Sequence, residues 1–427
     1  MADASTAGVR ERARRRRLVG LFFVLIAVVG CSQVRPHLNV PDVAVDEGVF
    51  VPTVEGVTGA PVTDGNAVDV LKNGDEIFPA QLKAIGAARK TITYAQYFYE
   101  DGPISRDIAA ALADRCRAGV RVHVLLDGFG SLGMPSAYRE TMEEAGCQVA
   151  VFRPLGPFAL FGRPNSRNHR RILVADGLVG FTGGSGLSWR WMGDGRTDGR
   201  WRDTDARVEG PGVRYLQSAF VENWLEATGE LLGGESYFPR LGQRGQSRVQ
   251  VVRSSPAGGS AEMYTLFLLA ISSARRYIYV TNPYFVPDGR MMEALVEAAR
   301  RRVEIVVLLP GKIDNNIVRQ ASRRELGRLM QAGVVVHEYQ AGLLHAKTMV
   351  IDGLWATIGS TNFDNRSFAL NEELNLVVYS RDVAARLERI FADDVSHAKR
   401  LTYEEWKHRG LKSRVFEWFS LPLKDQL

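Results

Sequence analysis

Cysteine and histidine are scarce in this 427-residue chain, which has three cysteines and seven histidines. Zinc and related metals are held by clusters of these side chains at short, regular spacings. No cysteine here has histidine partners at such a spacing, so we expect neither a metal site nor a cofactor. Cys116 and Cys147 are expected to be buried thiols, and a single disulfide in an oxidising compartment is the alternative.

Basic charge is also sparse outside the amino terminus. The first 35 residues hold seven arginines against Asp3 and Glu11, which makes +5 of the formal +6, so the remaining 392 residues carry about +1. Proteins that grip nucleic acid usually present a basic body or stripe. The nearly neutral body therefore predicts no nucleic-acid partner and disfavours a nuclease.

The apolar run near the amino terminus is short. Residues 18–30 fall below the ~20 residues that a membrane-spanning helix needs. The run follows an arginine cluster, as in a signal peptide, and "VVGC" at its end resembles a lipoprotein box that would place a lipid on Cys31. An uncleaved anchor is the alternative. Either way, we expect residues 1–46 to tether the body to a cell membrane, on its extracytoplasmic side.

The remaining composition is that of a globular α/β protein, with 45% hydrophobic residues, 24% charged residues and 42 glycines. Two long segments show the same order of helix, strand, helix and strand. "VRVHVLL" and "VEIVVLL" are apolar runs rich in β-branched residues, as buried strands are. Strands that alternate with helices predict a mixed sheet covered on both faces. We therefore expect two copies of one domain, at residues 47–246 and 247–427.

Each copy carries the same motif after this series. "HRRILVADGLVGFTGG" begins at His169, "HAKTMVIDGLWATIGS" begins at His345, and the two match in frame. Two residues after the histidine stands Arg171 in the first motif and Lys347 in the second, and residues two apart on a strand share a face. If a pseudo-two-fold brings both imidazoles to one cleft, one can attack a phosphorus atom while the other protonates the leaving oxygen. The cations would neutralise the phosphoryl charge.

Further polar residues follow each histidine. Asp176 and Asp352 belong to the motif, but their odd spacing from the histidine turns them away, so we expect them to organise the loop. Glu373 is a carboxylate that could hold an imidazole in one tautomer. The side chains expected to donate hydrogen bonds to a bound oxyanion are Ser360, Asn362 and Arg366.

These stretches resemble the phospholipase D superfamily, whose signature is a duplicated His-x-Lys-x(4)-Asp, and within it the bacterial cardiolipin synthase branch. The resemblance extends from about Asn73 to Lys399 and includes "YIYVTNPYFVPD" and "LLPGKIDNNIVRQAS". It implies an α/β fold of two homologous domains, each a mixed sheet flanked by helices, which share one active site across a pseudo-two-fold. It also implies phosphatidyl transfer through a phosphohistidine, in which two phosphatidylglycerols give cardiolipin and glycerol. By position, the resemblance implies catalytic roles for His169, Arg171, Asp176, His345, Lys347 and Asp352. Glu373 and Asp203 would orient the histidines.

The chain departs from the family pattern at two positions. Arg171 replaces the first lysine, and Gly186 stands where the second copy has Asn362. Arginine keeps the charge but is bulkier than lysine, and the glycine removes a donor. Both histidines remain, so we interpret the first half as modified and still active. The alternatives are a hydrolytic phospholipase D and a phospholipid-binding pseudoenzyme that does not turn over.

Several aromatic segments fit a lipid substrate and a membrane surface. The segment "FRPLGPFALFGRPNSRNHRR" is expected to be a loop beside the site, either at the interface or folded over the core. Trp189, Trp191 and Trp201 suit an interfacial rim or a packed wall, and residues 414–423 suit an interfacial tail. The expected partners are phosphatidylglycerol, cardiolipin and the membrane surface, and the sequence leaves the oligomeric state open.

Overall fold

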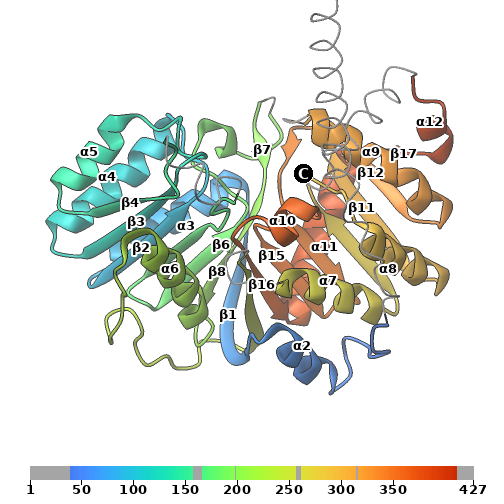
Figure 1. Cartoon of the computed structure of the whole chain (residues 1–427), viewed down its shortest axis with the longest axis horizontal. Coiled ribbons are helices and arrows are strands. Elements are labelled where there is room, and N and C mark those ends of the chain that lie inside the picture. The colour runs from blue at the N-terminus through green and yellow to red at the C-terminus, as the bar shows by residue number, and fades with distance from the viewer. Residues whose placement is uncertain (1–38, 157–165, 198, 256–260, 314–315, 411–427) are drawn as a thin grey trace, which may run out of the picture. The chain divides into compact units, whose positions relative to one another are not determined.

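A fifteen-stranded mixed sheet runs through the molecule, with helices on both of its faces (Figure 1). The computed structural model describes residues 39–410 except 157–165, 198, 256–260 and 314–315. Residues 18–30, Cys31 and the tail at 414–423 lie outside the described residues. Among the helices that are described, none has the length and apolarity of a membrane span.

The first half of the chain supplies eight strands and five α-helices of the described structure. Its strands are β1 (Val62–Lys72), β2 (Thr91–Gln96), β3 (Arg121–Asp127), β4 (Gln148–Phe152), β5 (Ile172–Ala175), β6 (Val179–Gly183), β7 (Trp201–Arg202) and β8 (Thr204–Glu209). Its helices are α2 (Phe50–Thr58), α3 (Asn73–Ala87), α4 (Pro103–Arg117), α5 (Ser136–Glu144) and α6 (Val213–Thr228), with a 3-10 turn η2 (Trp189–Trp191).

The second half repeats this series and adds an edge strand and a short last helix. Its strands are β9 (Ser247–Ser254), β10 (Tyr277–Thr281), β11 (Glu304–Pro310), β12 (Val335–Tyr339), β13 (Leu343–Leu344), β14 (Thr348–Ile351), β15 (Trp355–Gly359), β16 (Glu373–Tyr379) and β17 (Ala398–Leu401). Its helices are α7 (Glu262–Ser273), α8 (Gly289–Arg300), α9 (Asn316–Gln331), α10 (Asn365–Ala369), α11 (Arg381–Ser396) and α12 (Tyr403–Lys407).

The strand order is symmetric about the centre of the sheet. β1 and β9 pair antiparallel there, with Thr63 opposite Val249. Outward from this pair, β8, β6, β5, β2, β3 and β4 on one side match β16, β15, β14, β10, β11 and β12 on the other. The last three strands of each series are parallel. The predicted mixed α/β class is confirmed, and the two strand sets form one continuous sheet. The boundary after residue 246, just before β9, stays a prediction.

Two main hydrophobic clusters lie on opposite faces of the sheet in the first half. One cluster spans both halves of the chain and includes Leu216 and Phe220 of α6 with Leu387 and Ile390 of α11. The other packs α3 and α4 on the opposite side chains of β2 and β3. Strand β3 alternates between the two clusters, since successive strand residues face opposite ways. Burial on both faces explains its nearly continuous apolar sequence.

The two cysteines of the body form a disulfide, so the expectation of two free thiols is wrong. Cys116 at the end of α4 bonds to Cys147 just before β4, with 5.5 Å between their Cα atoms. The helix and the strand are 31 residues apart in sequence. They meet because α4 packs on β3 and on α5, and α5 in turn packs on β4, which lies parallel to β3.

Candidate active site

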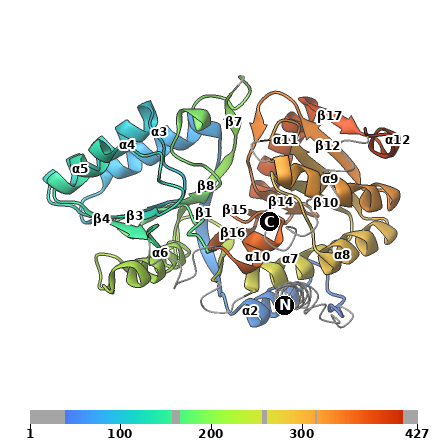
Figure 2. The same cartoon turned by 45° about the horizontal axis from the view of Figure 1, so that its top comes forward.

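The two histidine segments lie where the halves of the molecule exchange backbone contacts. β13, just before His345, pairs in parallel with β7 of the other half, and Figure 2 shows β7 between the two sets of strands. The amide of His345 donates to the carbonyl of Arg202 at 2.8 Å. The amide of His169 donates to the carbonyl of Glu372 at 2.9 Å. Each histidine is therefore anchored on the opposite half.

Each imidazole also contacts a carboxylate from the opposite half. Nδ1 of His169 lies 2.9 Å from Oε1 of Glu373, and Nδ1 of His345 lies 2.7 Å from Oδ2 of Asp203. The sequence pointed to both carboxylates but did not say which histidine each would hold. A carboxylate on Nδ1 fixes the ring orientation and leaves Nε2 for chemistry. Neither half can complete its own histidine–carboxylate pair.

Both histidines have lowered pKa values. Burial, followed by the charges of Arg171 and Lys347, holds the pKa of His169 well below its ordinary value. Burial and the charge of Lys347 lower the pKa of His345 to about 4, although Asp203 acts in the opposite direction. Cations from both halves act on each ring, so the two motifs lie in one electrostatic environment. Both rings are neutral at pH 7.

The two carboxylates differ in protonation. Burial raises the pKa of Glu373 to about 7, and its hydrogen bond from Ser360 only partly offsets this. Burial acts in the same direction on Asp203, but its interactions with His345, the charge of Lys347 and the hydrogen bond from Trp191 outweigh burial and hold the pKa of Asp203 below its ordinary value. Asp203 is thus ionised at pH 7, while Glu373 is near the midpoint of its titration.

The two cations of the motifs sit against their histidines in different ways. Nζ of Lys347 lies 2.9 Å from each ring nitrogen of His345. The guanidinium of Arg171 lies 5.4 Å from the ring centre of Tyr97 and donates to the backbone carbonyl of His169. Nε of Arg171 is buried and has no hydrogen-bond partner among the described residues. Both halves therefore place a buried cation beside the imidazole.

The three expected oxyanion donors have different surroundings. Oγ of Ser360 donates to Oε2 of Glu373 at 2.5 Å, so this hydroxyl supports a carboxylate in the structure. Asn362 is buried, and its Oδ1 has no hydrogen-bond partner in the described part of the chain. Arg366 lies on α10, and its charge contributes to the lowered pKa of His169.

The two motif aspartates lie away from the histidines. Asp176 and Asp352 follow β5 and β14, at the opposite ends of these strands from the histidines. Both have left-handed backbone conformations, with φ of 53° and 54°. Each carboxylate accepts three consecutive backbone amides, those of residues 89–91 and 275–277 respectively, at 2.6–2.9 Å. This is the loop-organising geometry that the spacing predicts, and it brings neither aspartate to the site.

Aromatic rings line both histidines. Tyr97 packs edge-on against His169 with 4.8 Å between ring centres. Trp191 and Trp201 lie 5.3 and 5.2 Å from the ring of His345, and both are buried. These two tryptophans therefore form a packed wall, whereas Trp189 is 43% exposed. The sequence left the choice between wall and rim open for all three.

Sequence reasoning missed a set of buried charged residues next to the site. Arg170 is fully buried, and its Nη2 lies 3.0 Å from Oε2 of Glu372 in the other half. Arg202 is equally buried and pairs with Asp394 of α11. A usable signal was present, because Arg170 stands where the second motif has the small apolar Ala346. Among the described residues, no group of three His, Cys, Asp or Glu side chains is arranged to hold a metal ion.

A symmetric α/β sheet with two histidine–cation motifs, each completed by a carboxylate from the opposite half, defines a phospholipase D-like protein. The family model described as "Cardiolipin synthase, PLD-like domain" matches residues 82–197 and 267–395. The chain therefore belongs to the cardiolipin synthase family of phospholipase D-like proteins.

Curated relatives support the same assignment. The cardiolipin synthase of Geobacillus kaustophilus (strain HTA426) is 36% identical over 359 residues, which cover 84% of this chain and 72% of the relative. The major cardiolipin synthase ClsA of Bacillus subtilis (strain 168) is 34% identical over 359 residues, covering 83% and 74%.

Solved structures agree on the fold. The phosphatidylserine synthase of Haemophilus influenzae Rd KW20 matches with a TM-score of 0.70 at 12% identity, covering 89% of this chain and all of that one. The polyphosphate kinase from Porphyromonas gingivalis matches with a TM-score of 0.53 at 12% identity, covering 92% and 57%. At such low identity these likenesses concern the fold alone.

Proposed function

We propose that this chain is a phosphatidyltransferase of the cardiolipin synthase type, which moves a phosphatidyl group from one phosphatidylglycerol to a hydroxyl of another. The observation that carries the proposal is the pair of buried histidines, each held at Nδ1 by a carboxylate of the opposite half and flanked by a cation. The cardiolipin synthase relatives support the same reaction.

The first step is attack by one imidazole on the phosphorus atom of phosphatidylglycerol. The lone pair of Nε2 forms the N–P bond as the P–O bond to the leaving glycerol breaks. A lowered histidine pKa favours this step, because the ring is already neutral at pH 7. Arg171 and Lys347 stabilise the charge that accumulates on the phosphoryl oxygens.

The second imidazole donates and accepts the proton in the two steps. It must be protonated to give a proton to the leaving glycerol oxygen, and the anionic phosphodiester raises its pKa when the substrate binds. In the return step the same ring accepts a proton from the hydroxyl of a second phosphatidylglycerol. That hydroxyl oxygen attacks phosphorus, the N–P bond breaks, and cardiolipin leaves with the free histidine restored.

The nature of the second acceptor separates this proposal from its alternatives. Purified protein is incubated with phosphatidylglycerol vesicles, and the lipids are analysed by mass spectrometry. We expect cardiolipin and glycerol in equal amounts, and no product from His345→Ala. Phosphatidic acid without cardiolipin would indicate a hydrolytic phospholipase D. Binding to the vesicles with neither product would indicate a pseudoenzyme.

The membrane surface is the proposed docking partner, through a rim of exposed apolar side chains beside the site. The rim consists of Phe129, Leu132, Leu155 and Trp189, which are 56%, 65%, 47% and 43% exposed. Phe129, Leu132 and Leu155 lie on the loops that follow β3 and β4, and Trp189 begins the turn η2 after β6. Apolar side chains of this size on adjacent loops suit insertion into the headgroup region of a bilayer.

Hydrogen bonds join these loops to one another and to the site. The amide of Gly128 donates to the carbonyl of Phe152 at 2.9 Å, and the amide of Tyr99 donates to the carbonyl of Gly130 at 3.2 Å. Oγ of Ser188 donates to Glu100 at 3.0 Å. The connecting loop after β2 also carries Tyr97, the ring that packs on His169, so the rim adjoins the proposed reaction site.

A matched pair of triple variants tests the rim. Phe129→Ser/Leu132→Ser/Trp189→Ser should lower turnover on phosphatidylglycerol vesicles about tenfold and leave turnover of a monomeric short-chain phosphatidylglycerol unchanged. The control carries Leu178→Ser/Leu225→Ser/Leu231→Ser, three exposed leucines outside the rim, and should match wild type on both substrates. Equal loss on vesicles in both variants would remove the rim from the proposal.

The body is proposed to lie on the extracytoplasmic side, held by a lipid on Cys31 or by an uncleaved anchor at residues 18–30. The disulfide between Cys116 and Cys147 supports this placement, because such bonds persist in oxidising compartments. Labelling of cells with a clickable fatty acid, compared between wild type and Cys31→Ala, separates the two forms of attachment. Unlabelled protein in the cytosolic fraction would exclude both.

A further inference from the structure

A buried ion pair joins the two halves directly behind the His345 site. Nε of Arg202 lies 2.9 and 3.0 Å from the two carboxylate oxygens of Asp394, and Nη2 lies 2.9 Å from Oδ2. The two side chains are only 1% and 2% exposed. Arg202 is in β7 of the first half, and Asp394 is near the end of α11 in the second. The pair thus crosses between the halves.

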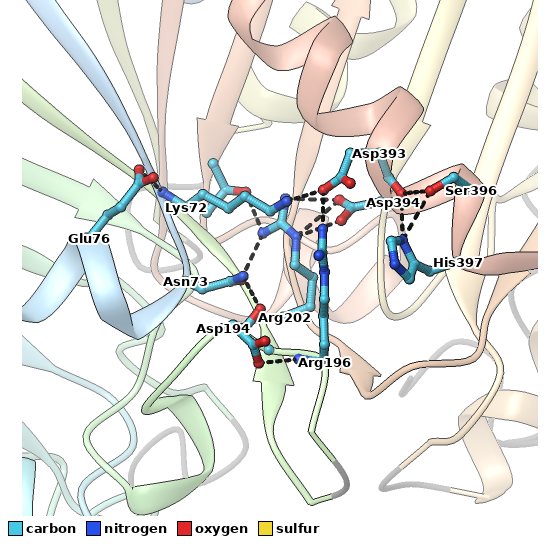
Figure 3. A network of polar contacts seen from close by, with 12 residues as sticks. Lys72, Asn73, Glu76, Asp194, Arg196, Arg202, Asp393, Asp394, Ser396 and His397 are labelled. Carbon is cyan, nitrogen blue, oxygen red and sulfur yellow. Dashed lines mark hydrogen bonds and ion pairs between the residues drawn. The ribbon is translucent and has the colours of Figure 1, made fainter.

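The network around this pair converges on the backbone next to Asp203. Figure 3 shows Arg202 between Asn73 and the two aspartates of α11. Nη1 of Arg202 donates to Oδ1 of Asn73 at 3.3 Å and to Oγ1 of Thr204 at 2.9 Å. Oδ1 of Asn73 also accepts the amide of Asp203 at 3.1 Å, and the amide of Asn73 donates to the carbonyl of Asp203 at 3.1 Å. The residues on both sides of Asp203 are therefore fixed.

Arg202 itself links the network to the histidine. It directly precedes Asp203, whose Oδ2 contacts Nδ1 of His345, and its own carbonyl accepts the amide of His345 at 2.8 Å. The ion pair with Asp394 therefore fixes one backbone segment that supports both the histidine and its carboxylate. The corresponding joint at His169 has the reverse charges, with Glu372 before Glu373 and Arg170 as its partner.

Stability alone does not account for a pair of this kind. Two fully buried charges lose their hydration, and an apolar pair of the same volume often gives an equal or higher stability. The neighbouring Asp393, by contrast, is 38% exposed and pairs with Lys72 and Arg196 at the surface. Exposed pairs of this type contribute little. Helix α11 thus presents two adjacent aspartates, and only one of them is buried behind the site.

We propose that Arg202 and Asp394 are a positioning pair, which holds Asp203 against His345 and sets the tautomer and orientation of this imidazole. The assignment rests on the proposed function for its effect on turnover. Its effect on His345 itself does not depend on any substrate. Neither residue touches the reacting atoms, so both act through Asp203.

The test compares Asp394→Asn with Asp393→Asn, two identical changes at neighbouring positions of one helix. In the full chain with ¹⁵N-labelled histidine, wild-type His345 should show a protonated Nδ1 at pH 7, with His345→Gln used to assign the signal. Asp394→Asn should convert this signal to a mixture of tautomers and lower kcat on phosphatidylglycerol roughly 10²-fold, with KM within about threefold. Asp393→Asn should leave both measurements at wild-type values.

A second variant removes the charges without leaving one of them unpaired. Arg202→Met/Asp394→Leu replaces the pair by apolar side chains and should keep the melting temperature within a few degrees of wild type. We expect the tautomer mixture and the loss of kcat to persist in this folded protein. If the pair had only a structural role, the restored packing would return the His345 signal and kcat to wild-type values.

Three results would overturn the proposal. The first is an unchanged His345 signal in Asp394→Asn, and the second is wild-type kcat in the folded double variant. The third is failure of both variants to fold, which would show that the pair holds the fold. If wild-type protein shows no phosphatidyl transfer, the proposed function fails, and the His345 signal still decides whether the pair positions the ring.

Discussion

The two histidine sites share one backbone frame but differ in the groups that support their carboxylates. At the His169 site, Glu373 accepts a hydrogen bond from the hydroxyl of Ser360. At the His345 site, Asp203 accepts one from the indole Nε1 of Trp191 at 2.8 Å. A duplicated scaffold can thus retain the histidine–carboxylate contact while the supporting donor changes from a serine to a tryptophan.

Two glycines provide the space that this change of donor requires. A Cβ at Gly184, the counterpart of Ser360, would lie 2.4 Å from Oδ1 of Asp203, so the close approach of that carboxylate requires glycine. A Cβ at Gly186 would lie 2.9 Å from the ring of Trp191. The glycine that the sequence identifies as a lost donor therefore makes room for the tryptophan that supports Asp203.

The cations differ together with a neighbouring side chain. Lys347 lines a small cavity with the neutral Asn375, whereas Arg171 lines the matching cavity with Asp205. Burial, together with the charge of Asp203, raises the pKa of Asp205 to about 6. The larger cation of the first half thus has an acid nearby, at the position where the second half has the neutral Asn375.

Loss of either imidazole should have the largest effect, and it should be equal at the two sites. His169→Ala and His345→Ala are each expected to lower kcat by roughly 10⁴-fold or more, because nucleophile and acid act as a unit. The double variant should be no worse than either single variant. Product formation from phosphatidylglycerol vesicles measures this. A clear difference between the two single variants would show that one histidine is dispensable.

Substitution of the two carboxylates should have different effects on the pH dependence of kcat. The pKa of Glu373 is raised to about 7, so this group loses its charge as the pH falls through 7, and its hold on Nδ1 of His169 weakens. We expect a decline of kcat below about pH 7 in wild type and no such decline in Glu373→Gln. Asp203→Asn should lower kcat roughly 10²–10⁴-fold at every pH and retain the acid limb. An acid limb that survives Glu373→Gln would assign it to another group.

The sequence predicted the motifs and the repeated strands, but it did not predict the contacts between them. The runs "VRVHVLL" and "VEIVVLL" became β3 and β11 because burial on both faces leaves a continuous apolar signal. The partner of Arg202 is 192 residues away, so no local pattern could reveal it. The contact of Trp191 with Gly186 also depends on tertiary packing, so the sequence alone could not predict it.

Substitutions at Arg171 test whether the two cations are equivalent. Arg171→Ala removes a charge from the transition state and should lower kcat roughly 10²–10³-fold. Arg171→Lys should remain within about tenfold of wild type, since Lys347 supplies a point charge at the corresponding place of the other site. Steady-state rates on phosphatidylglycerol decide this. Near wild-type turnover in Arg171→Ala would show that the first cation is not needed.

Restoring the asparagine that the second motif carries should reduce activity. Gly186→Asn would push Trp191 and weaken its hydrogen bond to Asp203, so we expect kcat to fall about tenfold, the effect of one lost hydrogen bond. Gly86→Asn is the control, because a Cβ at Gly86 meets nothing within 4 Å. A gain of activity in Gly186→Asn would show that the donor matters more than the indole.

The smallest effect on turnover is expected from the disulfide, which ties α4 to β4 in the first half and has no counterpart in the second. Closing a loop over 31 residues restricts the unfolded chain, so Cys116→Ala/Cys147→Ala should lower the free energy of unfolding by about 2–4 kcal/mol. β4 is the edge strand of the sheet, remote from the histidines in strand order, so kcat should stay within twofold of wild type. Reductant should lower the melting temperature of wild type to that of the double variant and leave the double variant unchanged. A loss of turnover in the folded double variant would instead couple the edge of the first half to its site.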